Sequence, residues 1–179
     1  MENTPKNMKH KVINWSNDKA LGYAKQIILD GGIIIYPTDT IYGFGIDATN
    51  ENSIKVLNKL KDRTGPISVL ASDKKIVSNW INIPKNEKGM ALKKLQDHKT
   101  IIFPVHKGVV NNLILGKHNT LGIRIPDHPF CILLSQRCGI PITTSSTPPE
   151  AAARRRRSIN GIRLSPPSKP NRLVPECVI

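Results

Sequence analysis

Apolar residues near the start of the chain follow a helical spacing and then a short continuous run. From Ser16 to Gly31 they recur at every third or fourth position, which predicts a helix that Ser16 or Asn17 caps and that the Gly-Gly pair ends. Four consecutive β-formers follow at 33–36, and so short a run fits a buried strand better than a helix. Pro37 ends this strand because it has no N–H to donate to a sheet.

The rest of the chain repeats the succession of strands and helices. Asn50 caps the second predicted helix, Ser72 or Asp73 the third, and Asp127 the last, which Gly139 ends. Strands that alternate with helices predict an α/β sandwich, and a twisted mixed sheet follows because several connections are too short for a crossover helix. The predicted elements are helices over 50–60, 73–80, 84–95 and 127–139 and strands over 67–71, 100–105, 121–125 and 142–146.

The residues that follow the strand at 33–36 are dense in polar chemistry. Residues 38–42, TDTIY, hold three hydroxyls and the Asp39 carboxylate, and Gly43 and Gly45 can adopt backbone angles that a side chain forbids. This predicts the wall of a pocket at a strand end. The competing interpretation is an ordinary strand–turn–strand whose threonines satisfy their own backbone, and residue types alone do not choose between the two.

Composition narrows the class of protein. The 179 residues, 39% of them hydrophobic, predict one domain with its own core, and a net charge of +14 favours an anionic partner such as RNA, nucleotide or phosphate over a merely well-solvated surface. Three cysteines without paired spacing indicate neither a disulfide framework nor a zinc ribbon. With no apolar run near the ~20 residues of a membrane span and no signal-peptide pattern, we expect a cytoplasmic protein without a membrane partner.

The candidate site residues are hydroxyls and cations at the ends of predicted elements. Arg124 alternates with apolar neighbours on its strand, so its guanidinium either faces the open end of the strand or is exposed to solvent without a function. For the cations at 61–63, which end a predicted helix, the helix dipole alone is also a sufficient explanation. Phosphate-loop and dinucleotide glycine motifs are absent, and no histidine pair has metal-ligand spacing, so we expect no metal held by the protein. Such a set suits phosphate-group chemistry. It consists of Thr38, Thr40, Lys61, Arg63, Thr100, Arg124, Ser145 and Ser146.

Four ordered motifs then carry a family resemblance. IIIYPTDTIYGFG, LKDR with PISVLAS, LGIRIPDHP and PITTSS resemble, in order and spacing, the YrdC family of threonylcarbamoyl-AMP synthases, over residues 20–147. The resemblance implies a YrdC-like α/β sandwich around a concave basic cleft. It also implies a nucleotidyltransferase that makes L-threonylcarbamoyl-AMP and pyrophosphate from L-threonine, bicarbonate and ATP with Mg2+. A partner threonylcarbamoyl transferase then modifies the adenosine beside a tRNA anticodon.

Residue roles follow from the matched positions. The resemblance implies that Thr38, with Thr40 beside it, holds threonine, and that Lys61 and Arg63 are the paired catalytic cations of a Lys-x-Arg signature that also contact threonine. It assigns the nucleotide side to four further residues, with Ser146 as the serine of a Ser-x-Asn signature; the four are Thr100, Arg124, Ser145 and Ser146.

The chain departs from the family pattern near its end. Pro148 stands where the family has asparagine, and a Pro-Gly-Pro that usually precedes the strand at Thr100 is missing. Residues 1–147 hold 17 Lys and 3 Arg, whereas residues 148–179 hold 1 Lys and 6 Arg with 6 of the 14 prolines. We therefore expect a YrdC-like domain over 1–147, led by a polar segment at 1–16, and a poorly ordered tail over 148–179. A changed reading frame or an unrelated fused terminus explains this tail better than a native one, and we predict impaired catalysis.

Two other interpretations stay open from the sequence. In the first, the chain is an RNA-binding module, for tRNA or double-stranded RNA, that keeps a basic cleft without the chemistry. In the second, it is a damaged or regulatory homologue that only binds nucleotide. Release of pyrophosphate from ATP in the presence of L-threonine and bicarbonate separates the enzyme from both.

Overall fold

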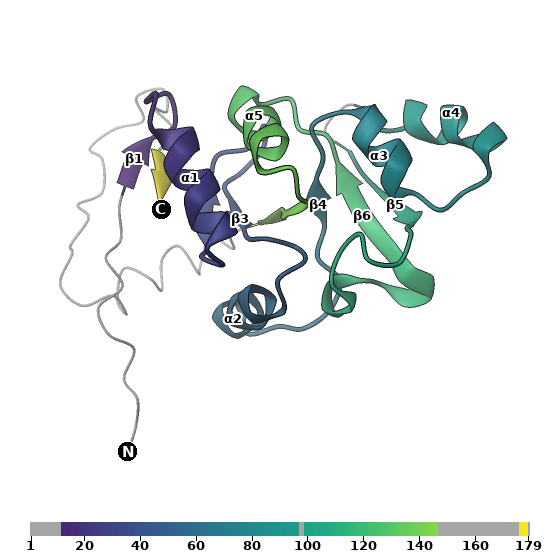
Figure 1. The fold of residues 1–179 in the computed structure, drawn as a ribbon, viewed down its shortest axis with the longest axis horizontal. Coiled ribbons are helices and arrows are strands. Elements are labelled where there is room, and N and C mark those ends of the chain that lie inside the picture. The colour runs from purple at the N-terminus through teal and green to yellow at the C-terminus, as the bar shows by residue number, and fades with distance from the viewer. Residues whose placement is uncertain (1–11, 97–98, 147–175, 179) are drawn as a thin grey trace, which may run out of the picture.

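Two β-sheets form the centre of the molecule (Figure 1). The computed structural model describes residues 12–96, 99–146 and 176–178. Its helices are α1 (Ala20–Leu29), α2 (Glu51–Lys61), α3 (Lys74–Trp80), α4 (Lys85–Lys93) and α5 (Pro129–Cys138), with short 3-10 helices at Asn112–Ile114 and Lys117–Asn119. Its strands are β1 (Val12–Asn14), β2 (Ile34–Tyr36), β3 (Gly43–Gly45), β4 (Val69–Leu70), β5 (Thr100–Pro104), β6 (Thr120–Arg124), β7 (Ile142–Thr143), β8 (Ser145–Ser146) and β9 (Glu176–Val178).

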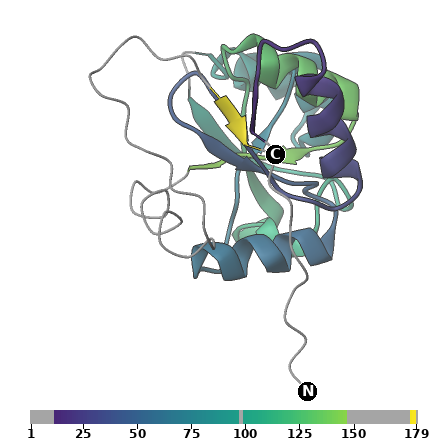
Figure 2. The same ribbon diagram turned by 90° about the vertical axis from the view of Figure 1, so that its left-hand side faces the viewer.

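The predicted mixed sheet is the four-stranded one. Its order is β5-β6-β4-β7, with β4 parallel to β6 and the other pairs antiparallel. A second, five-stranded sheet has the order β1-β9-β2-β3-β8 and is antiparallel throughout. In both ribbon views, α1 and α5 lie on one side of the strands and α2 lies on the other (Figures 1 and 2). The α/β sandwich expected from the alternating pattern is confirmed.

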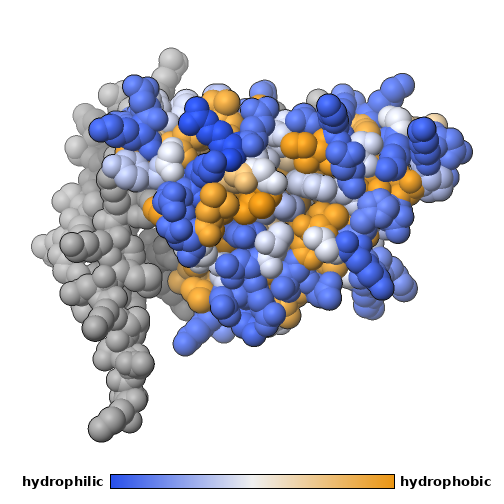
Figure 3. Space-filling view, in the orientation of Figure 1, coloured by the Kyte–Doolittle hydropathy of each residue, from blue (hydrophilic) through white to orange (hydrophobic). Residues whose placement is uncertain are grey.

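Side chains from both sheets build two hydrophobic clusters. One cluster lies under α2 and α3 and includes Ile54, Leu57 and Val77, and the other joins α1 to α5 through residues such as Ala24 and Leu134. On the face shown in Figure 3, hydrophilic side chains predominate, with hydrophobic patches between them. Removal of these apolar side chains from water is the main driving force that holds the helices on the sheets.

Helix ends follow local chemistry at some positions and tertiary contacts at others. Asn50 caps α2 through a bond from the Ser53 N–H, and Asp73 caps α3, as predicted. The prediction of a Ser16 or Asn17 cap is wrong, because α1 begins after Lys19 and the Asn17 carboxamide accepts the Lys19 N–H instead. The Asp127 cap is also wrong.

The start of α5 shows why the Asp127 prediction fails. His128 occupies the N-cap position and makes no side-chain cap bond. The Asp127 N–H instead donates to the Asp39 carboxylate at 3.3 Å, so Asp127 serves a contact with the 37–42 loop. Gly139 ends the helix in a left-handed conformation (φ 68°), as predicted.

The strand predicted over 142–146 is two strands in different sheets. β7 pairs with β4 in the mixed sheet, whereas β8 pairs with β3 in the antiparallel sheet. The chain crosses over at Thr144, whose N–H donates to the Ser68 carbonyl at 2.7 Å. The prediction of one continuous strand is therefore wrong, because each half has its hydrogen-bond partners in a different sheet.

The predicted tail falls mostly outside the described residues. Residues 147–175 and 179, which include Pro148 and the run Arg154–Arg157, are not described. Glu176–Val178 form β9, which pairs with β1 and β2. The domain boundary at Thr147 and the poor order of the tail as a whole stay predictions. Among the described residues, no helix has the length and apolar character needed to cross a bilayer.

The Thr143 hydroxyl joins the two sheets, and we expect it to contribute measurably to the free energy of unfolding. It accepts the Ile46 N–H at 3.2 Å and donates to the Phe44 carbonyl at 3.1 Å, in a fully buried position. Thr143→Val keeps the shape but leaves these groups without that partner. We expect a loss of about 1–3 kcal/mol in the free energy of unfolding, measured by urea denaturation. The exposed Thr64→Val serves as control, and equal stability of both variants would contradict the role of this hydroxyl.

Candidate functional site

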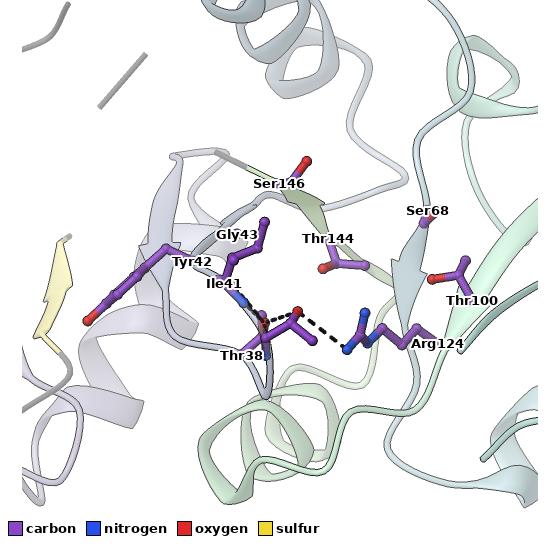
Figure 4. A pocket seen from close by; sticks show the side chains of 10 residues that line it. Thr38, Ile41, Tyr42, Gly43, Ser68, Thr100, Arg124, Thr144 and Ser146 are labelled. Carbon is purple, nitrogen blue, oxygen red and sulfur yellow. Dashed lines mark hydrogen bonds between the residues drawn. The ribbon is translucent and has the colours of Figure 1, made fainter. Parts of the chain in front are cut away.

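A small polar pocket lies where the two sheets meet. Its volume is about 200 Å³, and its walls come from the 37–42 loop, β3, β8 and the facing strands of the mixed sheet (Figure 4). The residues that line it are Thr38, Thr40, Ile41, Tyr42, Gly43, Ser68, Thr100, Arg124, Thr144 and Ser146.

Five of the eight predicted site residues line this pocket. Thr38 and Thr40 come from the loop, Thr100 and Arg124 from β5 and β6, and Ser146 from β8. Thr100 and Arg124 are register partners across β5 and β6, so their side chains share one face of the sheet. Despite the missing Pro-Gly-Pro, Thr100 begins β5 and reaches the pocket.

The sequence-based set missed Ser68 and Thr144. Both lie at the crossing between sheets, where the Thr144 N–H meets the Ser68 carbonyl, and no local motif marks that crossing. Tyr42 and Gly43 belong to the polar stretch that the sequence singled out, but they were not assigned a role. The signal that could have found them is their place immediately after the two threonines.

The Thr38 hydroxyl organises the loop. It donates to the Ile41 carbonyl at 2.6 Å and accepts the N–H groups of Thr40 and Ile41, each at 3.2 Å. β2 and β3 pair antiparallel on either side of the loop, with Tyr36 opposite Gly43. Both interpretations of this stretch therefore hold, because the threonine satisfies its own backbone and the resulting turn forms a wall of the pocket.

Lys61, in the last turn of α2, does not line the pocket but contacts Ser146, which does. Its ammonium donates to the Ser145 hydroxyl at 2.5 Å and to the Ser146 carbonyl at 2.6 Å, and it lies 5.6 Å from the centre of the Phe44 ring. Burial lowers the pKa of Lys61 below its ordinary value, and the nearby Arg63 guanidinium lowers it further. Ser145 is buried and holds Lys61 without lining the pocket itself.

Arg63 does not line the pocket in this structure. After α2, Asp62 adopts a left-handed conformation (φ 50°), which turns the chain, and the exposed Arg63 donates to the Pro66 carbonyl at 2.8 Å. The two cations predicted to act together are thus close enough to influence each other electrostatically, while only Lys61 contacts β8.

Arg124 is held by an acidic partner from the loop. Its terminal nitrogen lies 2.6 Å from Asp39 Oδ1 and 3.5 Å from the Thr40 hydroxyl. The side chains are 15% and 3% exposed, so most of both charged groups is removed from water. In Figure 4 the guanidinium points toward the loop that carries Thr38.

This arrangement suits an anionic ligand more than proton transfer. Hydroxyls and a guanidinium line the pocket, the Lys61 ammonium binds the carbonyl of the lining residue Ser146, and the Asp39 carboxylate is already ion-paired with Arg124. Hydroxyls and cations of this kind position and neutralise phosphate oxygens. Among the described residues, no group of three or more His, Cys, Asp or Glu side chains is placed to hold a metal ion.

The curated proteins compared with the chain here share one name. The chain is 30% identical over 129 residues to threonylcarbamoyl-AMP synthase of Marinobacter nauticus, covering 70% of this chain and 68% of that protein. It is 30% identical over 136 residues to the protein of the same name from Saccharophagus degradans, covering 74% and 71%. The match to the Bacillus subtilis threonylcarbamoyl-AMP synthase is 27% identical and covers 39% of that longer protein.

Solved structures and a family model also show similarity to this group of proteins. The fold is similar to that of P. abyssi Sua5 complexed with L-threonine, with a TM-score of 0.63 and 25% identity over 71% of this chain and 38% of that one. E. coli YciO shares the fold with a TM-score of 0.65 at 21% identity, over 78% and 74%. The model of the Sua5, YciO and YrdC family, described as "Telomere recombination", matches residues 26–157. The chain therefore belongs to the Sua5, YciO and YrdC family.

Proposed function

We propose that the protein is an L-threonylcarbamoyl-AMP synthase. The observation that carries this proposal is the pocket between the sheets, where the Thr38 and Thr40 hydroxyls lie beside Arg124 and where Lys61 contacts the lining residue Ser146. Relatives that bear this name are 30% identical to the chain over 129 and 136 residues. The reaction joins two anions, a carbamate and ATP, and the pocket combines cations and hydroxyls suited to that task.

The first half of the reaction concerns L-threonine. Its amine adds to CO2 derived from bicarbonate and loses a proton, which gives a carbamate. We assign Thr38 and Thr40 to threonine because they lie on one wall of the pocket, and the turn built on the Thr38 hydroxyl holds that wall in place before substrate arrives. A similar fold has been solved with L-threonine bound. Such preorganisation reduces the cost of binding.

The second half transfers the adenylate. A carbamate oxygen attacks the α-phosphorus of ATP, and the bond to the leaving pyrophosphate breaks. Thr100, Arg124 and Ser146 are assigned to the nucleotide side, and Ser145 acts on that side through Lys61, which it holds. Lys61 and Arg63 offset the repulsion between the two anions. Arg63 would have to leave the Pro66 carbonyl to do so, and its exposed position permits this movement.

Magnesium belongs to the nucleotide in this proposal. Mg2+ prefers phosphate oxygens and water, so it would arrive on the triphosphate of ATP. The hydroxyls and cations of the pocket would contact the complex from the side of the phosphates. The product then passes to a threonylcarbamoyl transferase that acts on tRNA. The competing function is a binding module for RNA or nucleotide, which the net charge of +14 favours.

The pyrophosphate assay tests the proposal directly. With ATP, L-threonine and bicarbonate, we expect pyrophosphate release that depends on all three. Lys61→Ala should lower kcat/KM by a factor of about 30–1000, which corresponds to the ~2–4 kcal/mol of a lost transition-state cation. Lys59→Ala removes an exposed cation from the same helix and should leave kcat/KM within about twofold of wild type. If the wild type released no pyrophosphate, the binding module would be favoured. If kcat/KM fell equally in both variants, the catalytic role of Lys61 would be contradicted.

The lowered pKa of Lys61 predicts an alkaline limit of activity. Lys61 acts as a cation, so activity is present below its pKa and is lost as pH rises through it, earlier than for an ordinary lysine. Arg63→Gln removes one cause of the depression and should shift this loss to higher pH in kcat/KM, because kcat/KM reports the pKa of the unliganded protein. Lys61→Arg, which stays protonated, should abolish it. An unchanged alkaline limb in both variants would show that another group titrates.

The tail predicts a further effect. The Pro148 side chain offers neither the carbonyl acceptor nor the amide donor of the family asparagine. Each lost hydrogen bond to a charged ligand costs about 1.5–3 kcal/mol. Replacement of residues 148–179 by a terminus that begins Asn-x-Ser-Gly should raise kcat/KM at least about tenfold. The single Pro148→Asn variant serves as a comparison. A wild type as active as the graft would contradict the proposed impairment.

A further inference from the structure

The Asp39 side chain is buried beside the pocket but does not line it. It lies on the 37–42 loop between the two threonines assigned to threonine binding, and 3% of it is exposed. One carboxylate oxygen lies 2.6 Å from the Arg124 guanidinium, and the other accepts the Asp127 N–H at 3.3 Å. Asp39 thus connects the loop with the end of β6 and with the turn before α5.

Arg124 depends on this contact for its orientation. A guanidinium on a long side chain has many rotamers, and its charge is costly to bury without a partner. The bond to Asp39 occupies the same terminal nitrogen that lies 3.5 Å from the Thr40 hydroxyl. This contact sets how the guanidinium stands in the pocket.

We propose that Asp39 is a positioning residue for the adenylate-forming reaction. It holds Arg124 in the orientation that the transferring phosphate requires, and it ties the threonine side of the pocket to the nucleotide side. It acts through Arg124, because the guanidinium lines the pocket and the carboxylate does not. This inference rests on the proposed function of the pocket.

A purely structural role for the ion pair leads to a different expectation. If the pair only stabilised the fold, loss of Asp39 would lower the thermal midpoint and leave the activity of the folded fraction intact. A positioning role instead requires that the effects of Asp39 and Arg124 on catalysis be coupled. Two residues that act as one unit give non-additive losses in a double-mutant cycle.

The experiment compares Asp39→Asn, Arg124→Gln and the double variant in the pyrophosphate assay. Asp39→Asn keeps the shape of the side chain and removes its charge. We expect kcat to fall about tenfold or more, since small misplacements of a catalytic group have effects of this size. KM for ATP should change less than about threefold because Arg124 keeps its charge. Asp127→Asn, which neutralises an exposed carboxylate nearby, should stay within about twofold of wild type.

The double variant decides the proposal. With Arg124 already replaced, the further change of Asp39 to Asn should lower kcat less than about threefold. Each single variant leaves one member of the buried pair without its partner, whereas the double variant removes both charges. Thermal midpoints are therefore measured for all three variants, and kcat is calculated per folded protein. Multiplying losses, or full activity of folded Asp39→Asn, would overturn the positioning role. A wild type that releases no pyrophosphate would instead refute the proposed function.

Discussion

The crossing of the chain from one sheet to the other at residues 142–146 is the constraint on which the site depends. Because β7 pairs with β4 and β8 pairs with β3, the two sheets must meet at Thr144. The buried Thr143 hydroxyl satisfies backbone groups of Phe44 and Ile46 at this point. The crossing brings strand ends of both sheets to one place, and the polar pocket forms there.

Two cations, Arg124 in the pocket wall and Lys61 on the lining residue Ser146, have different surroundings. Arg124 carries its counter-ion with it, since Asp39 is buried beside it. Lys61 instead contacts neutral oxygens of Ser145 and Ser146, so burial depresses its pKa while an incoming anion can still exchange for these neutral partners. Arg124 therefore has a charged partner in the structure, whereas the hydrogen bonds described for Lys61 go to neutral oxygens.

The family resemblance and the geometry constrain different things. The motifs identify the residues, and similarity to named synthases supports a shared reaction. The geometry separates their places: Thr38 and Arg124 line the pocket, Ser145 anchors Lys61, and Arg63 faces outward. A motif records that residues recur together, whereas the structure distinguishes contact with the pocket from support of another residue.

The sequence by itself determined most element types, the polar turn after Pro37 and the identity of five pocket residues, because these follow from local periodicity, turn chemistry and motif order. It did not reveal the two-sheet arrangement, the division of 142–146, the roles of Ser68 and Thr144, or the pairing of Asp39 with Arg124. That pair is separated by 85 positions, and Lys61 and Ser145 by 84. Only the tertiary structure decided these contacts, because hydrogen bonding and burial between distant segments leave no periodic trace in either segment.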